Sequence, residues 1–171
     1  MYWEEFHHLY KREELPAKTI LLKDGKVSKK IFYIEKGCVR AFFNHDGKDV
    51  SFQFFIEAEV VSSVESFMTE QPSQFTIETI EPCVIYSLSK TDFMEVINRS
   101  SSLKEQLNTL IFERLIFYQK LFLSRIRDNP EKRYRDLLKD KPELVVRIPQ
   151  HYLASYLGIT SVSLSRIRNR I

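Results

Sequence analysis

Short runs of β-branched and aromatic residues, separated by glycine-containing turns, fill the chain between Lys18 and Leu88. The turn sequences Lys23-Asp24-Gly25, Glu35-Lys36-Gly37 and His45-Asp46-Gly47 place a glycine where a tight turn needs a positive φ. Three of the four glycines are used in this way. Short strands at this spacing are typical of a β-sandwich or a small barrel. The expected strands are Thr19–Leu22, Ile31–Ile34, Val39–Phe43, Val50–Phe55, Phe75–Ile80 and Val84–Leu88.

The hydrophobic period changes from strand-like to helical near Ser89. Ser89 or Thr91 can cap a short helix that runs through residue 97. Ser101 or Ser102 can cap a long helix that reaches about residue 127, just before Asn129-Pro130.

The long helix carries apolar residues at the alternating four- and three-residue spacing of a coiled-coil seam. A second apolar stripe runs through Ile111, Leu115, Tyr118 and Phe122. A helix that is apolar around so much of its circumference must be buried on more than one side. One face can cover the β domain while the other packs against a second copy of the chain; the alternative is burial within one monomer. The residues expected at the dimer interface are Leu103, Leu107, Leu110, Arg114, Phe117 and Leu121.

The C-terminal segment Ile148–Ile171 contains two short amphipathic stretches that meet at Gly158. Gly158 can supply the left-handed turn that ends a first helix, and Thr160 can cap a second. This punctuation predicts a helix-turn-helix. The apolar residues that face its core are expected to be Tyr152, Leu153, Tyr156, Leu157, Leu164 and Ile167.

The segment between the long helix and this pair predicts one more helix and one strand. Residues 131–140 are expected to form a helix that Pro142 ends, and Leu144–Ile148 a short strand. A strand beside a helix-turn-helix indicates a winged helix. The chain is therefore expected to divide into a β-roll sensor domain (1–100), a dimerisation helix (101–128) and a winged helix-turn-helix (129–171).

Charge is distributed unevenly along the chain, although the net charge is only +3. Residues 1–98 hold 11 lysines and arginines against 16 acidic residues, whereas residues 99–171 hold 15 against 7. From Leu144 onward there are four arginines and no acidic residue. A basic C-terminal half is suited to contact with nucleic acid at one end of the molecule.

Composition limits the class of protein further. Hydrophobic residues make up 43% of the 171 residues, which is enough for a packed core. No apolar run approaches the roughly 18 to 20 residues that span a bilayer, and the N-terminus is too acidic and polar for a signal peptide. We therefore expect a cytoplasmic protein without membrane contact. Cys38 and Cys83 lack the spacing of a zinc or iron–sulfur site and are expected to be reduced core thiols.

The order of these elements resembles the CRP/FNR family of bacterial transcription regulators. Three stretches carry the resemblance: EKGCVRAFF (Glu35–Phe43), ESFMTEQPSQFTIETIEPCVIYSL (Glu65–Leu88) and IPQHYLASYLGITSVSLSRIR (Ile148–Arg168). The resemblance covers nearly the whole chain. It implies an α+β protein with an N-terminal double-stranded β-helix (jelly roll) similar to cyclic-nucleotide-binding domains. It also implies a homodimer that binds a palindromic operator in double-stranded DNA, with RNA polymerase and an unknown small-molecule effector as further candidate partners.

The positions that bind cyclic nucleotides in this family differ here. Cyclic-AMP-binding members carry a Gly-Glu pair and, further along, an Arg-Ser pair whose guanidinium neutralises the phosphate. The corresponding residues of this degenerate effector pocket are Ser62, Ser63, Ser73 and Gln74. A buried phosphate without a partner cation carries a large desolvation cost. We therefore expect an effector other than cyclic AMP or cyclic GMP, or no effector.

Cofactors are not expected. The N-terminal cysteine cluster of the iron–sulfur-sensing branch of the family has no counterpart in this sequence. Haem ligation by His7, His8 or His45 stays open as an alternative, but isolated histidines are more often surface groups. The sequence therefore predicts no metal site.

The helix expected to read DNA also departs from the family. Members that recognise the best-known palindrome carry Arg and Glu at the positions of Ser161 and Val162, and a second Arg at the position of Arg166. Because only Arg166 of these three residues is retained, the operator should differ from that palindrome. The resemblance implies that Arg166 reaches a guanine edge or a phosphate. Ser161, Val162 and Ser165 are expected to make shorter or apolar base contacts. The residues expected to contact phosphate are Gln150, His151, Thr160 and Ser163, with Arg168 either a backbone anchor or part of a solvated basic end.

Two other classes of protein stay open. A β-roll effector-binding or interaction module whose helical tail contacts a protein partner would not bind DNA. A cupin-like enzyme would need His and Glu at facial-triad spacing, or a nucleophile with a base, and the sequence shows neither. We therefore do not expect an enzyme.

Overall fold

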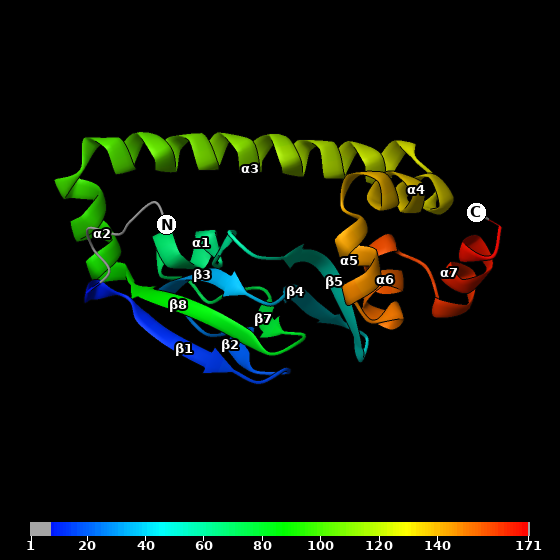
Figure 1. Ribbon diagram of the computed structural model, residues 1–171, viewed down its shortest axis with the longest axis horizontal. Coiled ribbons are helices and arrows are strands. Elements are labelled where there is room, and N and C mark those ends of the chain that lie inside the picture. Colours follow the sequence, from blue (N-terminus) through cyan, green and yellow to red (C-terminus); the bar gives the residue numbers. More distant parts are fainter. Residues whose placement is uncertain (1–7, 171) are drawn as a thin grey trace.

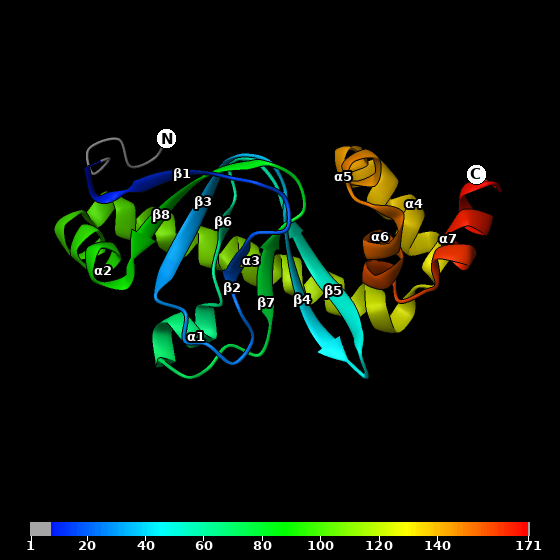
Figure 2. The same cartoon turned by 90° about the horizontal axis from the view of Figure 1, so that it is seen from below.

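The computed structural model describes residues 8–170 and places their strands in two antiparallel sheets (Figures 1 and 2). The strands are β1 (Lys11–Leu15), β2 (Ile20–Leu22), β3 (Lys30–Lys36), β4 (Val39–His45), β5 (Lys48–Phe55), β6 (Val60–Val61), β7 (Thr76–Thr79) and β8 (Cys83–Ser89). One sheet has the order β1-β8-β3-β6 and the other β2-β7-β4-β5. The two sheets enclose a common core, so the N-terminal part of the chain is a jelly roll, as predicted.

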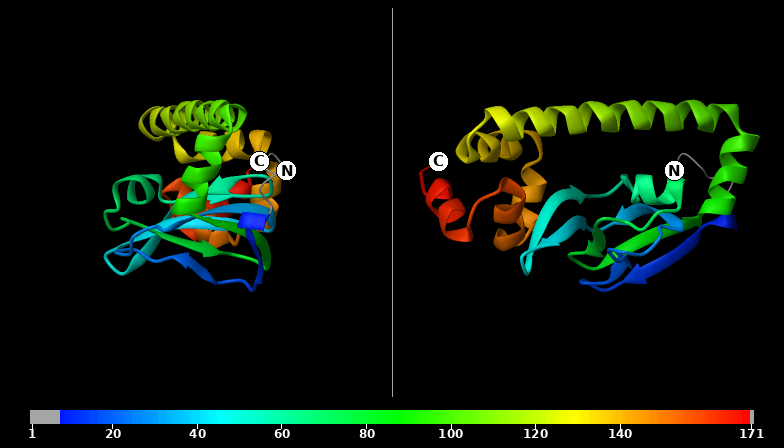
Figure 3. Two further views of the ribbon diagram at one scale, coloured as in Figure 1. Left: turned by 90° about the vertical axis from the view of Figure 1, so that its left-hand side faces the viewer. Right: turned by 180° about the vertical axis from the view of Figure 1, so that it is seen from behind.

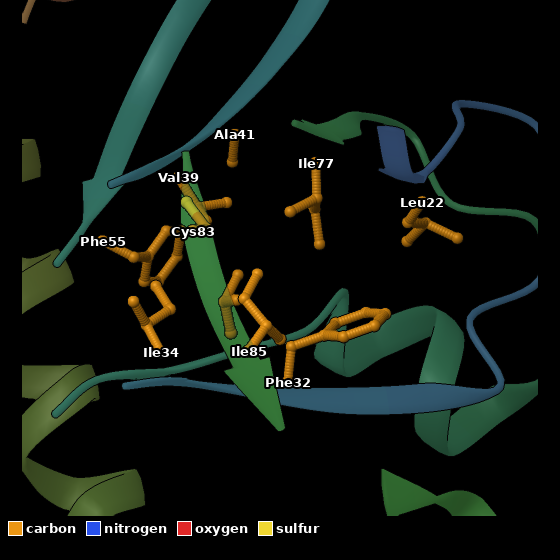
Figure 4. Packing of buried hydrophobic residues seen from close by; sticks show 10 residues of the cluster. Leu22, Phe32, Ile34, Val39, Ala41, Phe55, Ile77, Cys83 and Ile85 are labelled. Atoms are coloured by element: carbon orange, nitrogen blue, oxygen red, sulfur yellow. The ribbon is translucent and has the colours of Figure 1, made fainter. Parts of the chain in front are cut away.

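Alternating side chains of the strands fill the space between the sheets (Figure 4). On β3, Phe32 and Ile34 belong to this core, whereas Ile31 and Tyr33 lie on the outer side of the strand. The buried members of the core are Leu22, Phe32, Ile34, Val39, Ala41, Phe55, Val61, Ile77, Cys83 and Ile85. The protein's own side chains therefore fill the interior of the roll.

All six strands expected from the sequence are present, with ends that differ by one or a few residues. Two strands were not predicted. β1 has the sequence KREEL and pairs with β8 at the edge of its sheet, where charged side chains do not interrupt the hydrogen bonds of the backbone. β6 contains only two residues. Neither has the apolar alternation that identifies a strand in a sequence.

The glycine turns are confirmed. Gly25, Gly37 and Gly47 have positive φ angles of 77°, 106° and 77°. Gly37 is also in close contact with the start of β8, since a Cβ atom there would lie 2.5 Å from Sγ of Cys83. This position requires glycine for its backbone angle and for its lack of a side chain.

The helices are α1 (Val64–Thr69), α2 (Lys90–Arg99), α3 (Ser101–Arg127), α4 (Pro130–Asp140), α5 (Pro142–Arg147), α6 (Gln150–Leu157) and α7 (Ser161–Arg168). Five of the helices in the described part of the chain were predicted, whereas α1 and α5 were not. Ser89 caps α2 as expected, by accepting a hydrogen bond from the Asp92 N–H. The cap of α3 is Ser100, which accepts from the Leu103 N–H, and not Ser101 or Ser102. Figures 1 and 3 show α3 running along one side of the molecule, from α2 to α4.

The prediction of a strand at Leu144–Ile148 was wrong, because most of this segment belongs to helix α5. Pro142 at the first helical position favours a helix start, and Leu144 and Ile148, four residues apart, are both buried on one side. The short apolar run LVV was therefore part of a helical pattern. Within residues 8–170 no strand follows β8, so the strand expected to form a wing is not found there.

Cys38 and Cys83 are free, buried thiols that pack in two hydrophobic clusters, as expected. Burial raises the pKa of Cys38 to about 12 and that of Cys83 to about 11. Both side chains therefore stay protonated and unreactive near neutral pH. In the part of the chain that the structure describes, none of the helices combines the length and the apolar character needed to cross a membrane.

Candidate functional site

Helices α6 and α7 form the pair that the C-terminal sequence predicts. α6 ends at Gly158, which has a left-handed φ of 69°, and the following Ile159 N–H donates to the Ala154 carbonyl at 3.0 Å. Thr160 caps α7, because its Oγ1 accepts a hydrogen bond of 3.1 Å from the Ser163 N–H. The buried residues that join the two helices are Leu153, Leu157, Leu164 and Ile167. The turn therefore fixes α7 against α6.

Two arginines from preceding helices hold the C-terminal end of α6. Arg133 donates to the Leu157 carbonyl at 2.7 Å, and Arg125 donates to the Tyr156 carbonyl. Cations at a helix C-terminus satisfy carbonyl groups that have no partner within the helix and interact favourably with its dipole. The α6–α7 turn is therefore tied directly to α3 and α4.

The outward face of α7 carries small, exposed side chains, followed by an exposed arginine near the end of the helix. Ser161, Val162, Ser165 and Arg166 are all exposed, and 62% of Val162 is accessible. Leu164 and Ile167 anchor the opposite face in the core. Figure 2 shows α7 at the end of the molecule far from β1 and α2, so these side chains are free to approach a large ligand.

The remaining residues expected to contact DNA have structural roles as well. Gln150 donates through Nε2 to the Ser161 carbonyl at 2.9 Å and so joins the starts of α6 and α7. His151 is exposed and its ring lies 4.0 Å from that of Tyr152. Arg168 is half-buried and turns inward, donating to the Val145 carbonyl at 3.3 Å. This geometry favours a structural role for Arg168 over a solvated basic end.

Helix α6 packs directly on strand β5 of the roll, a contact that the sequence did not predict. The buried Arg40 guanidinium lies between two rings, 3.7 Å from the centroid of Phe42 and 3.8 Å from that of Tyr152. It also makes ion pairs of 3.0 Å with Asp49 and with Glu78. Stacking and charge pairing together hold the helix pair against the sheet.

A second ionic contact joins α5 to the roll. Arg147 binds Glu57 with two hydrogen bonds of 2.7 and 2.8 Å, and it also donates to Glu81. The Gly37 N–H donates to the same Glu57 carboxylate at 2.8 Å. Hydrogen bonds from Arg147 lower the pKa of Glu57 to about 2. The carboxylate therefore stays charged over the physiological range.

The side chains of Ser62, Ser73 and Gln74, expected to form part of the effector pocket, are engaged with other groups of the protein. Ser62 donates to the Lys30 carbonyl at 3.2 Å, and Ser73 to the Phe75 carbonyl at 2.8 Å. Gln74 donates to the Glu65 carboxylate at 3.2 Å, and Ser63 is buried in front of α1. An acidic partner at Gln74 is the reverse of what a phosphate requires.

A cavity lies elsewhere, between α3 and the outer face of the β3–β8 sheet. Its volume is about 620 Å³. Tyr33 and Tyr86 belong to its sheet side, and Leu110, Arg114 and Phe117 to its helix side. Ser62, Ser63, Ser73 and Gln74 do not line it. The cavity is therefore lined by residues other than the four expected to form an effector pocket.

The residues expected at a dimer interface lie mainly on the side of α3 that faces the protein's own β domain. Leu103 and Leu107 pack with α2, Arg114 lies over Phe55, and Leu110 and Phe117 line the cavity. Leu121 is half-buried. The opposite side of α3 exposes large apolar side chains, Phe112 (64% exposed), Phe122 (64%) and Ile126 (70%), whereas Leu115 (61%) lies at the edge of the cavity.

No group of three or more His, Cys, Asp or Glu side chains that could hold a metal ion occurs among the residues that the structure describes. His8 and His45, named above as alternatives for haem ligation, are exposed, and His7 lies outside the described residues.

The chain thus consists of a jelly roll, a long helix and a terminal helix pair, and sequence comparison identifies the family of the jelly roll. The profile of the cyclic nucleotide-binding domain family matches residues 12–100. The chain belongs to this family. A search of curated protein sequences found no match.

Solved structures of CRP/FNR family regulators share the fold over nearly the whole chain. The catabolite activator protein of Thermus thermophilus is 19% identical, with a TM-score of 0.62, and the alignment covers 99% of this chain and 81% of that one. FixK2 from Bradyrhizobium japonicum is 14% identical, with a TM-score of 0.80 and coverage of 94% and 83%. A CooA mutant from Carboxydothermus hydrogenoformans is 12% identical, with a TM-score of 0.80 and coverage of 98% and 78%. The resemblance to this family is therefore confirmed at the level of the fold.

Proposed function

We propose that this protein is a sequence-specific DNA-binding transcription regulator of the CRP/FNR type, in which α6 and α7 form the helix-turn-helix and α7 enters the major groove. The outward face of α7 carries this proposal. It presents small side chains followed by an exposed arginine, while its inner face is anchored by Leu164 and Ile167. Small side chains let a helix approach base edges closely, and an arginine can bind guanine O6 and N7.

Individual residues take different parts in this proposal. Arg166 contacts a guanine edge, and Ser161, Val162 and Ser165 contact bases at shorter range. Thr160 and Ser163 lie at the N-terminus of α7, where backbone N–H groups favour a phosphate. In this proposal Gln150 and His151 contact the backbone of the same half-site, whereas Arg168 supports the helix from inside. The proposed division at residues 100/101 and 128/129 follows the ends of α3.

We propose that the chain dimerises through the exposed side of α3. The six residues that the sequence placed at a dimer seam, from Leu103 to Leu121, instead contact the protein's own roll and α2 in this proposal. Phe112, Phe122 and Ile126 lie along one side of the helix at seam spacing and are each more than 60% exposed. A parallel pair of such helices places two copies of α7 for successive major grooves, roughly 34 Å apart. The operator is then palindromic.

Cyclic nucleotides are not the effector in this proposal. The side chains at the phosphate-binding positions are serines and a glutamine that bond to backbone carbonyls and to Glu65. Aromatic and aliphatic side chains occupy the interior of the roll. A cyclic phosphate there would be desolvated without a paired cation.

The test is selection from random DNA followed by binding assays with the selected sequence. Wild-type protein should enrich a palindrome, and Arg166→Ala should lower the affinity for it by about 10- to 100-fold while reducing discrimination at one base pair of each half-site. Lys104→Ala is the matched control, because it removes an exposed cation near the start of α3, the end of that helix far from α7. It should leave the affinity unchanged.

Salt separates this function from a protein-interaction module. DNA affinity should fall steeply between low and high salt, since each phosphate contact releases counterions. Failure to enrich any motif at low salt, or equal binding by Arg166→Ala and Lys104→Ala, would overturn the proposal.

A further inference from the structure

We propose that the cavity between α3 and the β-roll binds a small organic acid, one that combines an apolar or aromatic body with a single anionic group held by Arg114. The cavity has a volume of about 620 Å³. This lies within the range of roughly 300 to 1,000 Å³ that is usual for small-molecule sites.

The side chains that line the cavity favour a ligand that is mostly apolar. The sheet contributes the rings of Tyr33 and Tyr86 together with Val60, and α3 contributes Leu107 and Leu110. Sites of this composition exclude strongly hydrated ligands, because a polar group buried there without a hydrogen bond costs free energy. A sugar or an unsubstituted polar metabolite does not fit such walls.

The polar groups of the cavity specify the charge of the ligand. Lys141 is paired with Glu59 at 3.3 Å, and the Tyr118 hydroxyl donates to Gln53 at 2.6 Å. Glu113 also lines the cavity, but its side chain is exposed to solvent. Arg114 differs from these groups. It is half-buried, its guanidinium lies 5.2 Å from the centroid of Phe55, and within residues 8–170 it forms no ion pair. A cation without a carboxylate partner at an apolar wall attracts one anionic group and repels cationic ligands.

The position of the cavity connects the ligand to the rest of the molecule. One wall belongs to β3 and β8, the other belongs to α3, and Lys141 lies at the start of α5. A ligand there contacts both the roll and the helices that lead to α7. The regulatory meaning of binding rests on the proposed function, whereas binding itself does not require DNA.

Calorimetric titration of the full chain tests the proposal. The probes are decanoate and 1-naphthoate, with 1-decanol and 1-naphthalenemethanol as their uncharged counterparts. We expect saturable binding of at least one acid with one site per chain; decanoate alone would identify an alkyl body, and naphthoate alone an aromatic body. Arg114→Gln should weaken acid binding about tenfold or more, since it removes a charge-assisted hydrogen bond. It should leave binding of the alcohols unchanged.

Two further variants complete the experiment. Lys120→Gln removes an exposed cation elsewhere on α3 and should bind the acids like the wild type. Leu110→Trp fills the cavity and should abolish binding of acids and alcohols alike, with a melting temperature no lower than that of the wild type. The proposal is overturned if neither acid binds, or if Arg114→Gln and Lys120→Gln bind the acids equally. A failed DNA selection leaves all of these outcomes unchanged.

Discussion

Gly37 is the residue whose replacement the fold tolerates least among the turn glycines. Its φ is 106°, and a Cβ atom there would lie 2.5 Å from Sγ of Cys83 and 2.8 Å from the Pro82 carbonyl oxygen. Gly37→Ala should lower the free energy of unfolding by about 2 to 4 kcal/mol, because backbone strain and overpacking add. Urea denaturation followed by circular dichroism measures the change.

Gly47→Ala is the matched control for this prediction. Gly47 also has a positive φ, of 77°, but a Cβ atom at this position would meet no other atom within 4 Å. Only the backbone penalty of about 1 to 2 kcal/mol applies. Equal losses for the two variants would show that the contact with Cys83 carries no cost.

The ion pair of Glu57 and Arg147 predicts an acid-sensitive contact. The pKa of Glu57 is lowered to about 2 from its ordinary value of 4.5 by the hydrogen bonds from Arg147. A carboxyl group whose pKa is lower in the folded state contributes stability above its unfolded pKa, and this contribution is lost as the pH falls through the folded pKa. Between about pH 4.5 and pH 2, Glu57→Gln should therefore lose its difference in melting temperature from the wild type.

Scanning calorimetry of both proteins across this pH range measures that convergence. Glu143→Gln is the control, because it removes an exposed carboxylate from the neighbouring helix α5. Its difference from the wild type should be small at every pH. A difference between Glu57→Gln and the wild type that persists unchanged at pH 2 would contradict the assignment.

At the scale of elements, the two sides of α3 have different surroundings. The side with Leu103, Leu107 and Phe117 faces α2 and the cavity. The side with Phe112 and Phe122 is exposed. Burying several side chains of this size is worth roughly 1.5 to 3 kcal/mol each, which is enough to drive association.

Phe122→Glu should therefore convert a dimer into a monomer. Phe122 is 64% exposed, so its replacement should hardly change the stability of the single chain, while a charge at the centre of an apolar seam opposes dimerisation. Sedimentation velocity measures the change. Gln106→Glu adds the same charge on another side of α3 and should remain dimeric; identical sedimentation of the two variants would reject this face as the interface.

Elements with a clear period could be predicted from the sequence, and relations between elements could not. The six apolar strands, α2, α3, α4 and the turn at Gly158 all have local signals in period or capping. The stretch Leu144–Ile148 was misassigned because a short apolar run fits a strand and a buried helix equally well. The two stripes of α3 were visible, but only the three-dimensional fold shows which of them meets the roll.

The same contrast applies to the candidate site: residues with a local sequence signal could be predicted, and contacts between distant residues could not. Gly158, Thr160 and the outward residues of α7 were predicted, since capping and helical spacing determine them. Arg147 and Glu57 were missed, because 90 residues separate them in the sequence. Arg40 had one signal that could have been used: it is a charged residue between Val39 and Ala41 in an apolar strand, and a buried charge requires partners.

At the scale of the whole molecule, the C-terminal helices share a core with the β-roll. Phe54 of β5 and Cys38 lie in one cluster with Leu153 and Leu157 of α6. The Ser51 N–H donates to Ser155 Oγ at 2.8 Å across the same boundary. The helix pair is therefore docked on the roll, and a change in the roll can reach α7 through β5 and α6 as well as through α3.

Tyr152→Ala should loosen this docking while leaving both parts folded. The substitution removes one of the two rings that enclose Arg40, whose ion pairs with Asp49 and Glu78 stay in place. Loss of a desolvated cation–π contact and of buried ring surface should cost about 2 kcal/mol of docking free energy. Amide hydrogen exchange should then increase by about 10- to 30-fold in β5 and α6, since local opening becomes more frequent.

Exchange in β3 and β8 should remain unchanged, because these strands pair with each other in the sheet that does not contain β5. Val162→Ala provides the control within the helix pair: Val162 is 62% exposed on α7, away from the sheet, so exchange in β5 should match that of the wild type. Faster exchange throughout the roll in Tyr152→Ala would mean that the ring stabilises the global fold. Unchanged exchange in β5 would mean that α6 is held by the shared apolar core alone, with no contribution from the stacked arginine.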